Sequence, residues 1–284
     1  MPETEEDSPA HSYEYVKIPD RCRTETMNLV DAHIHLTDAE FLHYINSVIV
    51  TLKAMKIKVC SVCVDNRTSL FSIDLLSDPT LRSSVFVFIG IHPRSADNED
   101  VIEFERILSN HIQSVDGIGE IGLDRSYTEN GFSSYRKQTE VFESMLRLAE
   151  QYHKPVSVHS RKSIDEILQV ISSYNIVAVL MHWFSGNKRQ LNACMDRGYY
   201  VSYGPPLLYS EDKRALLRKT HRSNILIETD GPNRYSHCFG NYPALPSSFL
   251  VSVAKSVSEV LLMPYDETVE MLSLNWSHFI SRKL

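Results

Sequence analysis

The chain has 284 residues, of which 43% are hydrophobic, and a formal net charge of −7 at pH 7. This length and apolar content suffice for one large domain or two small ones. The acidic balance argues against binding nucleic acid through bulk positive charge, although it leaves room for a protein that handles phosphates through metal ions and a few local cations. No run of residues approaches the roughly 18 consecutive apolar residues of a membrane span, so we expect no membrane association.

The first 27 residues are acidic and polar and show little hydrophobic pattern. They have neither the basic nor the apolar region of a secretory signal, so we interpret residues 1–27 as a flexible, disordered leader and residues 28–284 as the folded domain. The five cysteines are scattered and odd in number, which does not suit a disulfide framework. Cys60 and Cys63, three apart in an apolar run, would face opposite sides of a strand and are interpreted as core residues. We expect a reducing, intracellular location in cytoplasm or nucleus.

Along the rest of the chain, apolar segments that predict strands alternate with segments of helical periodicity. Strands are predicted at residues 29–34, 57–64, 85–90, 115–121, 155–159, 176–182, 199–203 and 224–229. Helices are predicted at residues 39–55, 101–111, 135–152, 164–173, 188–197 and 213–220, with a helical tail over about 264–284. This alternation predicts an α/β fold, a single (β/α)8 TIM-type barrel with the C-terminal helical tail covering it. A doubly wound open sheet is the competing fold, but its G-x-G-x-x-G signature is absent.

The first predicted strand ends in Asp31-Ala32-His33-Ile34-His35. Residues i and i+2 of a strand point the same way, so His33 and His35 can aim both imidazoles at one point past the end of the strand. A divalent metal site needs such an arrangement. Taken alone, the spacing suits paired core or surface histidines equally well.

Ligand-type residues also stand at the ends of four other predicted strands. The carboxyl ends of all strands of a closed parallel barrel meet at one rim, so we expect these side chains to converge there. The six residues are His33, His35, Glu120, His159, His182 and Asp230. One such histidine would most often be a satisfied core residue, but six donors at five strand ends predict a metal site.

The types of these donors narrow the choice of metal. Mixed imidazole and carboxylate ligands suit zinc, manganese or iron better than calcium. Six donors exceed the three protein ligands of a simple catalytic zinc site, so we predict two divalent ions, Zn²⁺, Mg²⁺ or Mn²⁺, about 3.5–4 Å apart and bridged by a carboxylate. Glu120 is the predicted bridge. Asp230 could bind one ion and also accept a proton from the attacking water.

Six short motifs follow one another along the chain. They are DAHIHL (31–36), GIHPR (90–94), GIGEIGLD (117–124), VSVHSR (156–161), MHWFSG (181–186) and LIETDGP (226–232). In this order the chain resembles the TatD-type metal-dependent deoxyribonucleases, within the amidohydrolase-like metal hydrolases. D-x-H-x-H is shared with other amidohydrolases, whereas GEIGLD, H-x-F-x-G and ETD-x-P together are specific to this family. The resemblance spans nearly everything after the leader and implies a (β/α)8 barrel, the same six residues as metal ligands, and exonuclease or endonuclease activity on DNA.

Two residues are predicted to contact the substrate phosphate. His92 matches the family's substrate-side histidine, and its alternative role is loop packing beside Pro93. Arg161 points to the same side of its strand end as His159 and could hold a phosphate oxygen bidentately. The alternative for Arg161 is an ion pair that orients Glu120 or Asp124. Together with Glu120 and Asp230, these two residues make up the predicted catalytic set.

Three further polar residues are predicted to support the site. Asp124 would fix a histidine tautomer or a loop, since such partners commonly accompany ligating histidines. Glu228 alternates with Asp230 along its strand, so it either reaches the cavity or supports a ligand. Asn275 corresponds to the family's C-terminal asparagine and is interpreted as structural.

Two rim loops, residues 199–206 and 233–244, depart from the pattern of bacterial members. Their aromatic residues could stack unpaired bases, which would suit single-stranded DNA ends, or serve only in packing. These residues are Tyr203, Tyr235, Phe239 and Tyr242, of which Tyr203 is retained as a predicted substrate contact.

The sequence thus favours a metal-dependent deoxyribonuclease of exonuclease type that hydrolyses phosphodiesters with metal-activated water. The expected partner is DNA, as single strands or strand ends, and the expected state is a monomer or weak oligomer. Hydrolysis of another bond by the same chemistry, in an ester, a lactone or a D-aminoacyl-tRNA, is the alternative. A non-catalytic interaction protein is a third hypothesis, but it has no chemical need for all six donors.

Overall fold

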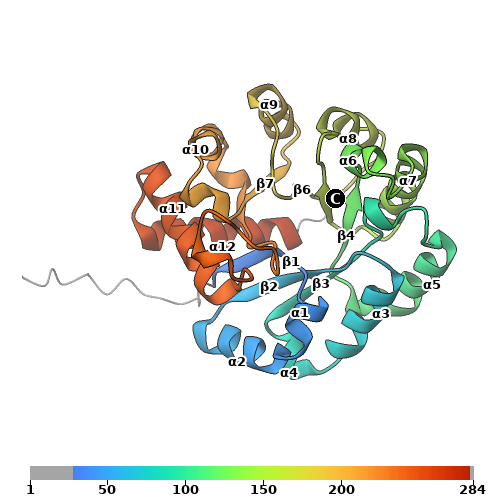
Figure 1. Cartoon of the computed structure of the whole chain (residues 1–284), viewed down its shortest axis with the longest axis horizontal. Helices are drawn as coiled ribbons and strands as arrows, with labels where there is room; N and C mark the ends of the chain where they lie inside the picture. The colour runs from blue at the N-terminus through green and yellow to red at the C-terminus, as the bar shows by residue number, and fades with distance from the viewer. Residues whose placement is uncertain (1–27, 282–284) are drawn as a thin grey trace, which may run out of the picture.

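The computed structural model describes residues 28–281, so the expected leader (1–27) and residues 282–284 lie outside the described part. Eight parallel strands pair in sequence order, with helices around them (Figure 1). The strands are β1 (Val30–Ile34), β2 (Lys58–Val62), β3 (Val85–Ile89), β4 (Gly117–Gly122), β5 (Val156–His159), β6 (Val179–Met181), β7 (Tyr200–Tyr203) and β8 (Ile225–Ile227). The α-helices are α1 (Ala39–Leu42), α2 (Ile45–Met55), α3 (Asn66–Leu75), α4 (Pro79–Arg82), α5 (Val101–His111), α6 (Arg125–Glu129), α7 (Tyr135–Gln151), α8 (Ile164–Ile171), α9 (Lys188–Asp196), α10 (Glu211–Leu217), α11 (Val251–Leu261) and α12 (Tyr265–Ser281). The predicted (β/α)8 barrel is confirmed.

Hydrogen bonds between β1 and the segment after β8 bring the two edges of the sheet together. The N–H of Asp230 donates to the carbonyl of His33 at 2.9 Å, and the N–H of His35 donates to the carbonyl of the next glycine at 2.8 Å. Closer to the amino end of β1, the buried Asp31 accepts hydrogen bonds from the N–H of Thr229 at 3.0 Å and from the Thr229 hydroxyl at 2.5 Å. Three of the predicted donors therefore meet where the barrel closes.

The C-terminal helix α12 closes the amino-terminal end of the barrel. Its Trp276 and Phe279 pack with side chains from β1, β2, β3, β6, β7 and β8 that point inward. Asn275 Nδ2 donates to the carbonyls of Arg222 at 2.7 Å and Ile225 at 2.8 Å, at the start of β8. This is the structural role predicted for Asn275, since a buried carbonyl needs a partner.

The helices agree with the sequence less well than the strands. α5, α7, α8, α9 and α10 lie where helices are predicted, but the single helix expected over 39–55 is two, α1 and α2. Phe41 is fully buried and anchors the short α1 separately. The sequence does not predict α3, a serine-rich segment of weak periodicity, although Asp65 and Thr68 form a capping box at its start.

Two irregularities in strand register lie beside the predicted site. Along β1, Asp31 and Ile34 pair with Val59 and Ser61, so three steps on β1 match two on β2. The same offset occurs in β4, where Ile118 and Ile121 pair with Val156 and Val158 on β5. Such bulges redirect side chains near active sites, and here they contain His33 and Glu120.

Cys60 and Cys63 face opposite sides of the barrel wall, as predicted. Cys60 packs inside the barrel, and Cys63 packs with the apolar side chains between strands and helices. Both are free thiols.

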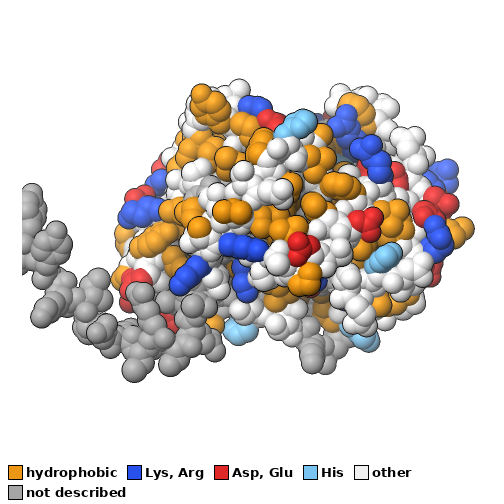
Figure 2. All heavy atoms as spheres, turned by 90° about the horizontal axis from the view of Figure 1, so that it is seen from below, with side chains coloured by type: hydrophobic (Ala, Val, Ile, Leu, Met, Phe, Trp, Pro, Cys, Tyr) orange, Lys and Arg blue, Asp and Glu red, His pale blue; other side chains and the backbone are white. Residues whose placement is uncertain are grey.

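On the face shown in Figure 2, basic side chains lie in small groups among acidic and apolar ones. Within residues 28–281, no helix combines the length and apolar character that a bilayer span requires.

Candidate active site

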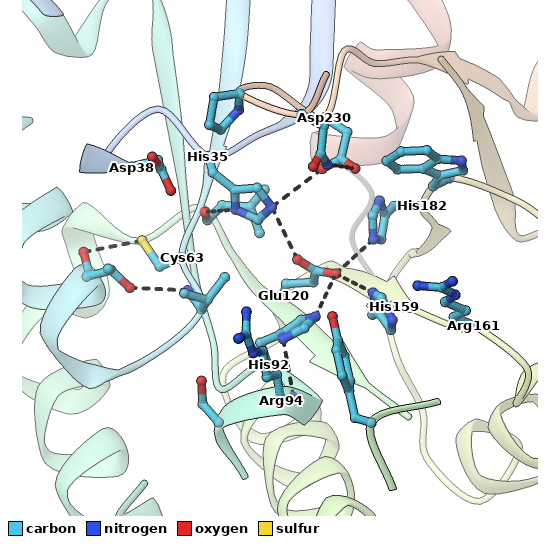
Figure 3. A pocket seen from close by; sticks show the side chains of 18 of the residues that line it. His35, Asp38, Cys63, His92, Arg94, Glu120, His159, Arg161, His182 and Asp230 are labelled. Carbon is cyan, nitrogen blue, oxygen red and sulfur yellow. Dashed lines mark hydrogen bonds and ion pairs between the residues drawn. The ribbon is translucent and has the colours of Figure 1, made fainter. Parts of the chain in front are cut away.

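A pocket of about 1280 Å³ opens at the carboxyl ends of the strands. We call the six predicted donors the donor cluster. Its members are His33, His35, Glu120, His159, His182 and Asp230. All of them except His33 line the pocket, and His33 lies fully buried behind the others. Figure 3 shows Glu120 in the middle, with His35, His159, His182 and Asp230 around it.

The two oxygens of Glu120 face different partners. Oε2 lies 3.4 Å from His33 Nε2 and 3.5 Å from His35 Nε2. Oε1 lies 2.7 Å from His159 Nδ1 and 2.8 Å from His182 Nε2. Glu120 is 2% exposed, so its carboxylate has little access to water. Glu120 therefore stands between two groups of nitrogen donors, which adjoin where the rings of His33 and His182 stack with centroids 3.8 Å apart.

Asp230 completes the first of these groups. Its Oδ1 lies 3.4 Å from His35 Nε2 and 3.9 Å from His33 Nε2. Its Oδ2 accepts from Asn233 Nδ2 at 2.6 Å, which fixes the direction of the carboxylate. Ring and carboxylate atoms of the three residues lie within 4.8 Å of one another, close enough to share a cation.

The second group, His159 and His182, is backed by carboxylates on its far side. His159 Nε2 lies 2.8 Å from Asp124 Oδ2, and the other oxygen of Asp124 accepts from the N–H of Ser126 at the start of α6. His182 Nδ1 lies 3.7 Å from Glu228 Oε2. Asp124 thus fixes both a histidine and a loop, as predicted. Glu228 lies behind His182 and does not line the pocket.

The first group is oriented by neighbouring strands. His35 Nδ1 lies 3.0 Å from the carbonyl of Val62. Because a carbonyl can only accept, this bond places a proton on Nδ1, and Nε2 is the nitrogen that faces Glu120 and Asp230. His33 Nδ1 lies 3.0 Å from the hydroxyl of Ser157.

The charges of the cluster are strongly coupled. Burial opposes a charged ring, but Asp230 and Glu120 outweigh it and raise the pKa of His35 to about 9. Burial, together with the ring of His182, lowers the pKa of His33 to about 4. Burial would also raise the pKa of Glu120, yet the surrounding imidazoles, led by His92, hold it well below its usual range. An ionised carboxylate in a buried cluster favours occupation by cations.

His92 borders the pocket next to the second group. Its Nδ1 accepts from the N–H of Arg94 at 3.2 Å, and its Nε2 lies 3.4 Å from Glu120 Oε1. Burial lowers the pKa of His92. Because Nδ1 accepts a hydrogen bond, the proton of the neutral ring lies on Nε2. This proton lies beside Glu120 Oε1 at the wall of the pocket, which suits a hydrogen-bond donor better than a metal ligand.

Arg161 is exposed and lines the pocket (Figure 3). Within the described part of the chain, it forms no ion pair with Glu120 or Asp124, which was the alternative role. Its guanidinium is therefore available to a ligand.

The aromatic residues predicted for the rim are mostly packed away from it. Tyr203 is 2% exposed, and its hydroxyl is 2.7 Å from that of Thr220. The prediction of Tyr203 as a substrate contact is therefore wrong, because the side chain belongs to the core. Tyr235 is also buried, and Phe239 stacks on Phe249 at 3.7 Å. Tyr242 is exposed but does not line the pocket.

Other residues, which the sequence does not single out, line the pocket instead. Tyr127 stacks beside His159 with ring centroids 6.0 Å apart, and Phe132 lies under the guanidinium of Arg94 at 4.5 Å. Trp183 lies next to His182. Trp183 lies within the motif MHWFSG, and Tyr127 lies three residues after the motif GIGEIGLD. These positions close to recognised ligands could have indicated both residues in the sequence.

A (β/α)8 barrel with imidazoles and carboxylates gathered around a pocket at its carboxyl rim defines a metal-dependent hydrolase. The family model "TatD related DNase" matches residues 30–281. The chain belongs to this family. The predicted family and the predicted class of metal-dependent hydrolase are thus confirmed.

Curated relatives and solved structures agree with this assignment. A Bacillus subtilis protein, "Uncharacterized metal-dependent hydrolase YabD", is 27% identical over 87% of this chain and 96% of its own. Human "Deoxyribonuclease TATDN3" is 26% identical over 74% of this chain and 80% of its own. The crystal structure of YJJV, a TatD homologue from Escherichia coli, covers 89% of this chain and 97% of its own with a TM-score of 0.79 at 21% identity, which shows the shared fold.

Proposed function

We propose that the protein is a deoxyribonuclease that hydrolyses phosphodiester bonds of DNA with two divalent cations, Zn²⁺, Mg²⁺ or Mn²⁺, held by the donor cluster. One observation carries the proposal: Glu120 Oε2 faces His33 and His35, while Oε1 faces His159 and His182. A carboxylate in that position can bridge two cations. The family description and the name of the human relative support DNA as the substrate.

The spacing within the first group fits a shared cation. His33 Nε2 is buried and has no hydrogen-bond partner within residues 28–281. It and His35 Nε2 lie 3.4–3.9 Å from the facing oxygens of Glu120 and Asp230. Hydrogen bonds are shorter than this. Two ligands about 2.1 Å from one cation at a tetrahedral angle lie about 3.4 Å apart, so the separations suit coordination.

We assign the residues as follows. His33, His35 and Asp230 would hold one cation, His159 and His182 the other, and Glu120 both. When bound, the cations supply an activated water near neutral pH and offset the charge on the phosphoryl oxygens.

Asp230, with Oδ2 held by Asn233, accepts a proton from the attacking water as the new bond to phosphorus forms. The bond from phosphorus to the leaving nucleoside oxygen breaks, and that oxygen takes a proton from solvent. His92 Nε2–H and Arg161 donate to the phosphoryl oxygens and hold them in place.

Single strands and strand ends are the proposed form of the DNA. A chain of net charge −7 gains little from the dense phosphates of a long duplex, so binding depends on the metals and the few pocket cations.

The test is hydrolysis of labelled single-stranded DNA by the metal-free protein and by the protein loaded separately with Zn²⁺, Mg²⁺ and Mn²⁺. The same preparations are offered a lactone, an ester and a D-aminoacyl-tRNA. We expect metal-dependent cleavage of DNA. Turnover of one of the other probes without cleavage of DNA would overturn the substrate assignment while keeping the metal chemistry.

A further inference from the structure

Trp183 has an unusual backbone conformation at the end of β6. Its φ of 42° lies in the left-handed region, which bulky side chains rarely adopt. Its N–H donates to Glu228 Oε1 at 2.7 Å and to Ser202 Oγ at 3.2 Å. Both partners are buried, and the Ser202 hydroxyl donates to Glu228 Oε2 at 2.6 Å. A buried network from β7 and β8 thus holds Trp183 in place, and such over-determined strain marks functional sites.

The indole of Trp183 is supported on one side and borders the pocket. It packs against the ring of Tyr235, with centroids 5.7 Å apart and planes 34° apart. Tyr235 is itself fixed, because its hydroxyl donates to the carbonyl of Thr229 at 2.7 Å. Trp183 is half-buried and lines the pocket directly after His182. A large aromatic ring is therefore held rigidly beside the donor cluster.

The other aromatic rings of the pocket, within the described residues, are engaged by neighbours. Tyr127 packs against His92 and His159, and Phe132 is covered by the guanidinium of Arg94. β5 pairs with β6, and the exposed Arg161 follows β5 just as Trp183 follows β6. An aromatic surface and an available guanidinium thus extend from adjacent strand ends.

We propose that Trp183 stacks on an unpaired nucleobase beside the scissile phosphate, while Arg161 contacts the backbone of the same strand. The inference rests on the proposed deoxyribonuclease function and names the part of the substrate that the pocket recognises. Stacking on an aromatic side chain requires a base that is not paired, and it tolerates any sequence because every base has a π face. The site would therefore take single strands or frayed ends of any sequence.

The experiment compares single-stranded oligonucleotides that differ by one base. A tetrahydrofuran abasic analogue replaces each nucleotide in turn, counted from either end, and kcat/KM is measured for wild type and Trp183→Ala. We expect one position at which loss of the base lowers kcat/KM of wild type about 10-fold and that of Trp183→Ala less than about 2-fold. Tyr265→Ala removes an exposed aromatic from α12, outside the pocket, and should keep the wild-type penalty.

A second measurement does not depend on turnover. The chain has two tryptophans, and Trp276 is buried at the opposite end of the barrel. Binding of a phosphorothioate oligothymidylate should quench the fluorescence of wild type, and Trp183→Phe should abolish this change. An unchanged base penalty in Trp183→Ala at every position, or quenching retained in Trp183→Phe, would refute the stacking role. Failure of wild type to cleave any DNA would instead remove the proposed function, and the stacking role with it.

Discussion

Replacing Glu120 by alanine removes the carboxylate that faces both halves of the donor cluster. Its two oxygens lie between 2.7 and 3.5 Å from the nearest nitrogens of five histidines, including His92. Loss of a residue that only supports a metal ligand typically costs 10–100-fold. Because Glu120 serves two groups directly, we expect kcat/KM to fall about 10³-fold or more, which is about 4 kcal/mol of transition-state stabilisation.

The assay pairs activity with metal content. Cleavage of a fluorescein-labelled single-stranded oligonucleotide is followed on gels, and bound metal per chain is measured by mass spectrometry after dialysis. Glu140→Ala, an exposed glutamate on α7, is the matched control and should match wild type in both. Full activity together with unchanged metal content in Glu120→Ala would show that the donor cluster is not the catalytic centre.

Three further outcomes are expected. Chelation with EDTA should lower Tm by about 11–22 °C, because each of the two proposed cations at 100 times its Kd contributes about 2.7 kcal/mol and each kcal/mol shifts Tm by about 2–4 °C in a domain approaching this size. An unchanged melting curve would contradict this. Arg161→Ala should raise KM for single-stranded DNA about 10-fold. The control Arg125→Ala, which breaks an exposed ion pair with Glu166, should leave KM unchanged. If steady-state kinetics show the same change in KM for both variants, Arg161 does not contact the phosphate. Burial raises the pKa of Cys63 to about 12, so its thiolate is scarce at neutral pH. Peptide mass spectrometry should therefore find little alkylation of Cys63 in the folded protein from pH 7 to 9, whereas the partly exposed Cys238 should be labelled faster as the pH rises.

The strands were predictable because parallel barrel strands are buried on both faces and read as continuous apolar runs. Val85–Ile89 is such a run. It forms β3, which begins at the predicted residue and ends one residue before the predicted end. Helices of the outer ring carry a weaker signal when small polar residues face the core. In α3, Ser69 and Ser72 are buried, so the apolar stripe that normally reveals a helix is incomplete.

The convergence of the donor cluster was predictable from strand ends alone, since neighbouring parallel strands place their carboxyl ends at one rim. The sequence also predicts Glu120 as a bridge, but it does not show which histidines face each oxygen, because that depends on the bulge in β4 and on side-chain torsions that the sequence does not specify.

The prediction for Tyr203 was wrong about the side of the strand that this residue faces. Successive residues of a strand face opposite sides. On β7, the hydroxyl of Ser202 reaches Glu228 behind the site, while Tyr203 points toward Thr220 in the surrounding layer. Treating this strand end as a loop hid the alternation.

The acidic composition and a polyanionic substrate are compatible if positive charge enters with the cofactor. The donor cluster contributes two carboxylates, whereas two divalent cations would add four positive charges at the same place. Arg161 and His92 Nε2–H then extend a local positive field into the pocket, and the rest of the surface can stay acidic. If the proposed function holds, affinity for DNA follows metal occupancy, and we expect the metal-free protein neither to cleave nor to retain nucleic acid. In this proposal the metal centre recognises only the phosphate, and the preference for unpaired strands comes from stacking of a base on Trp183 beside it.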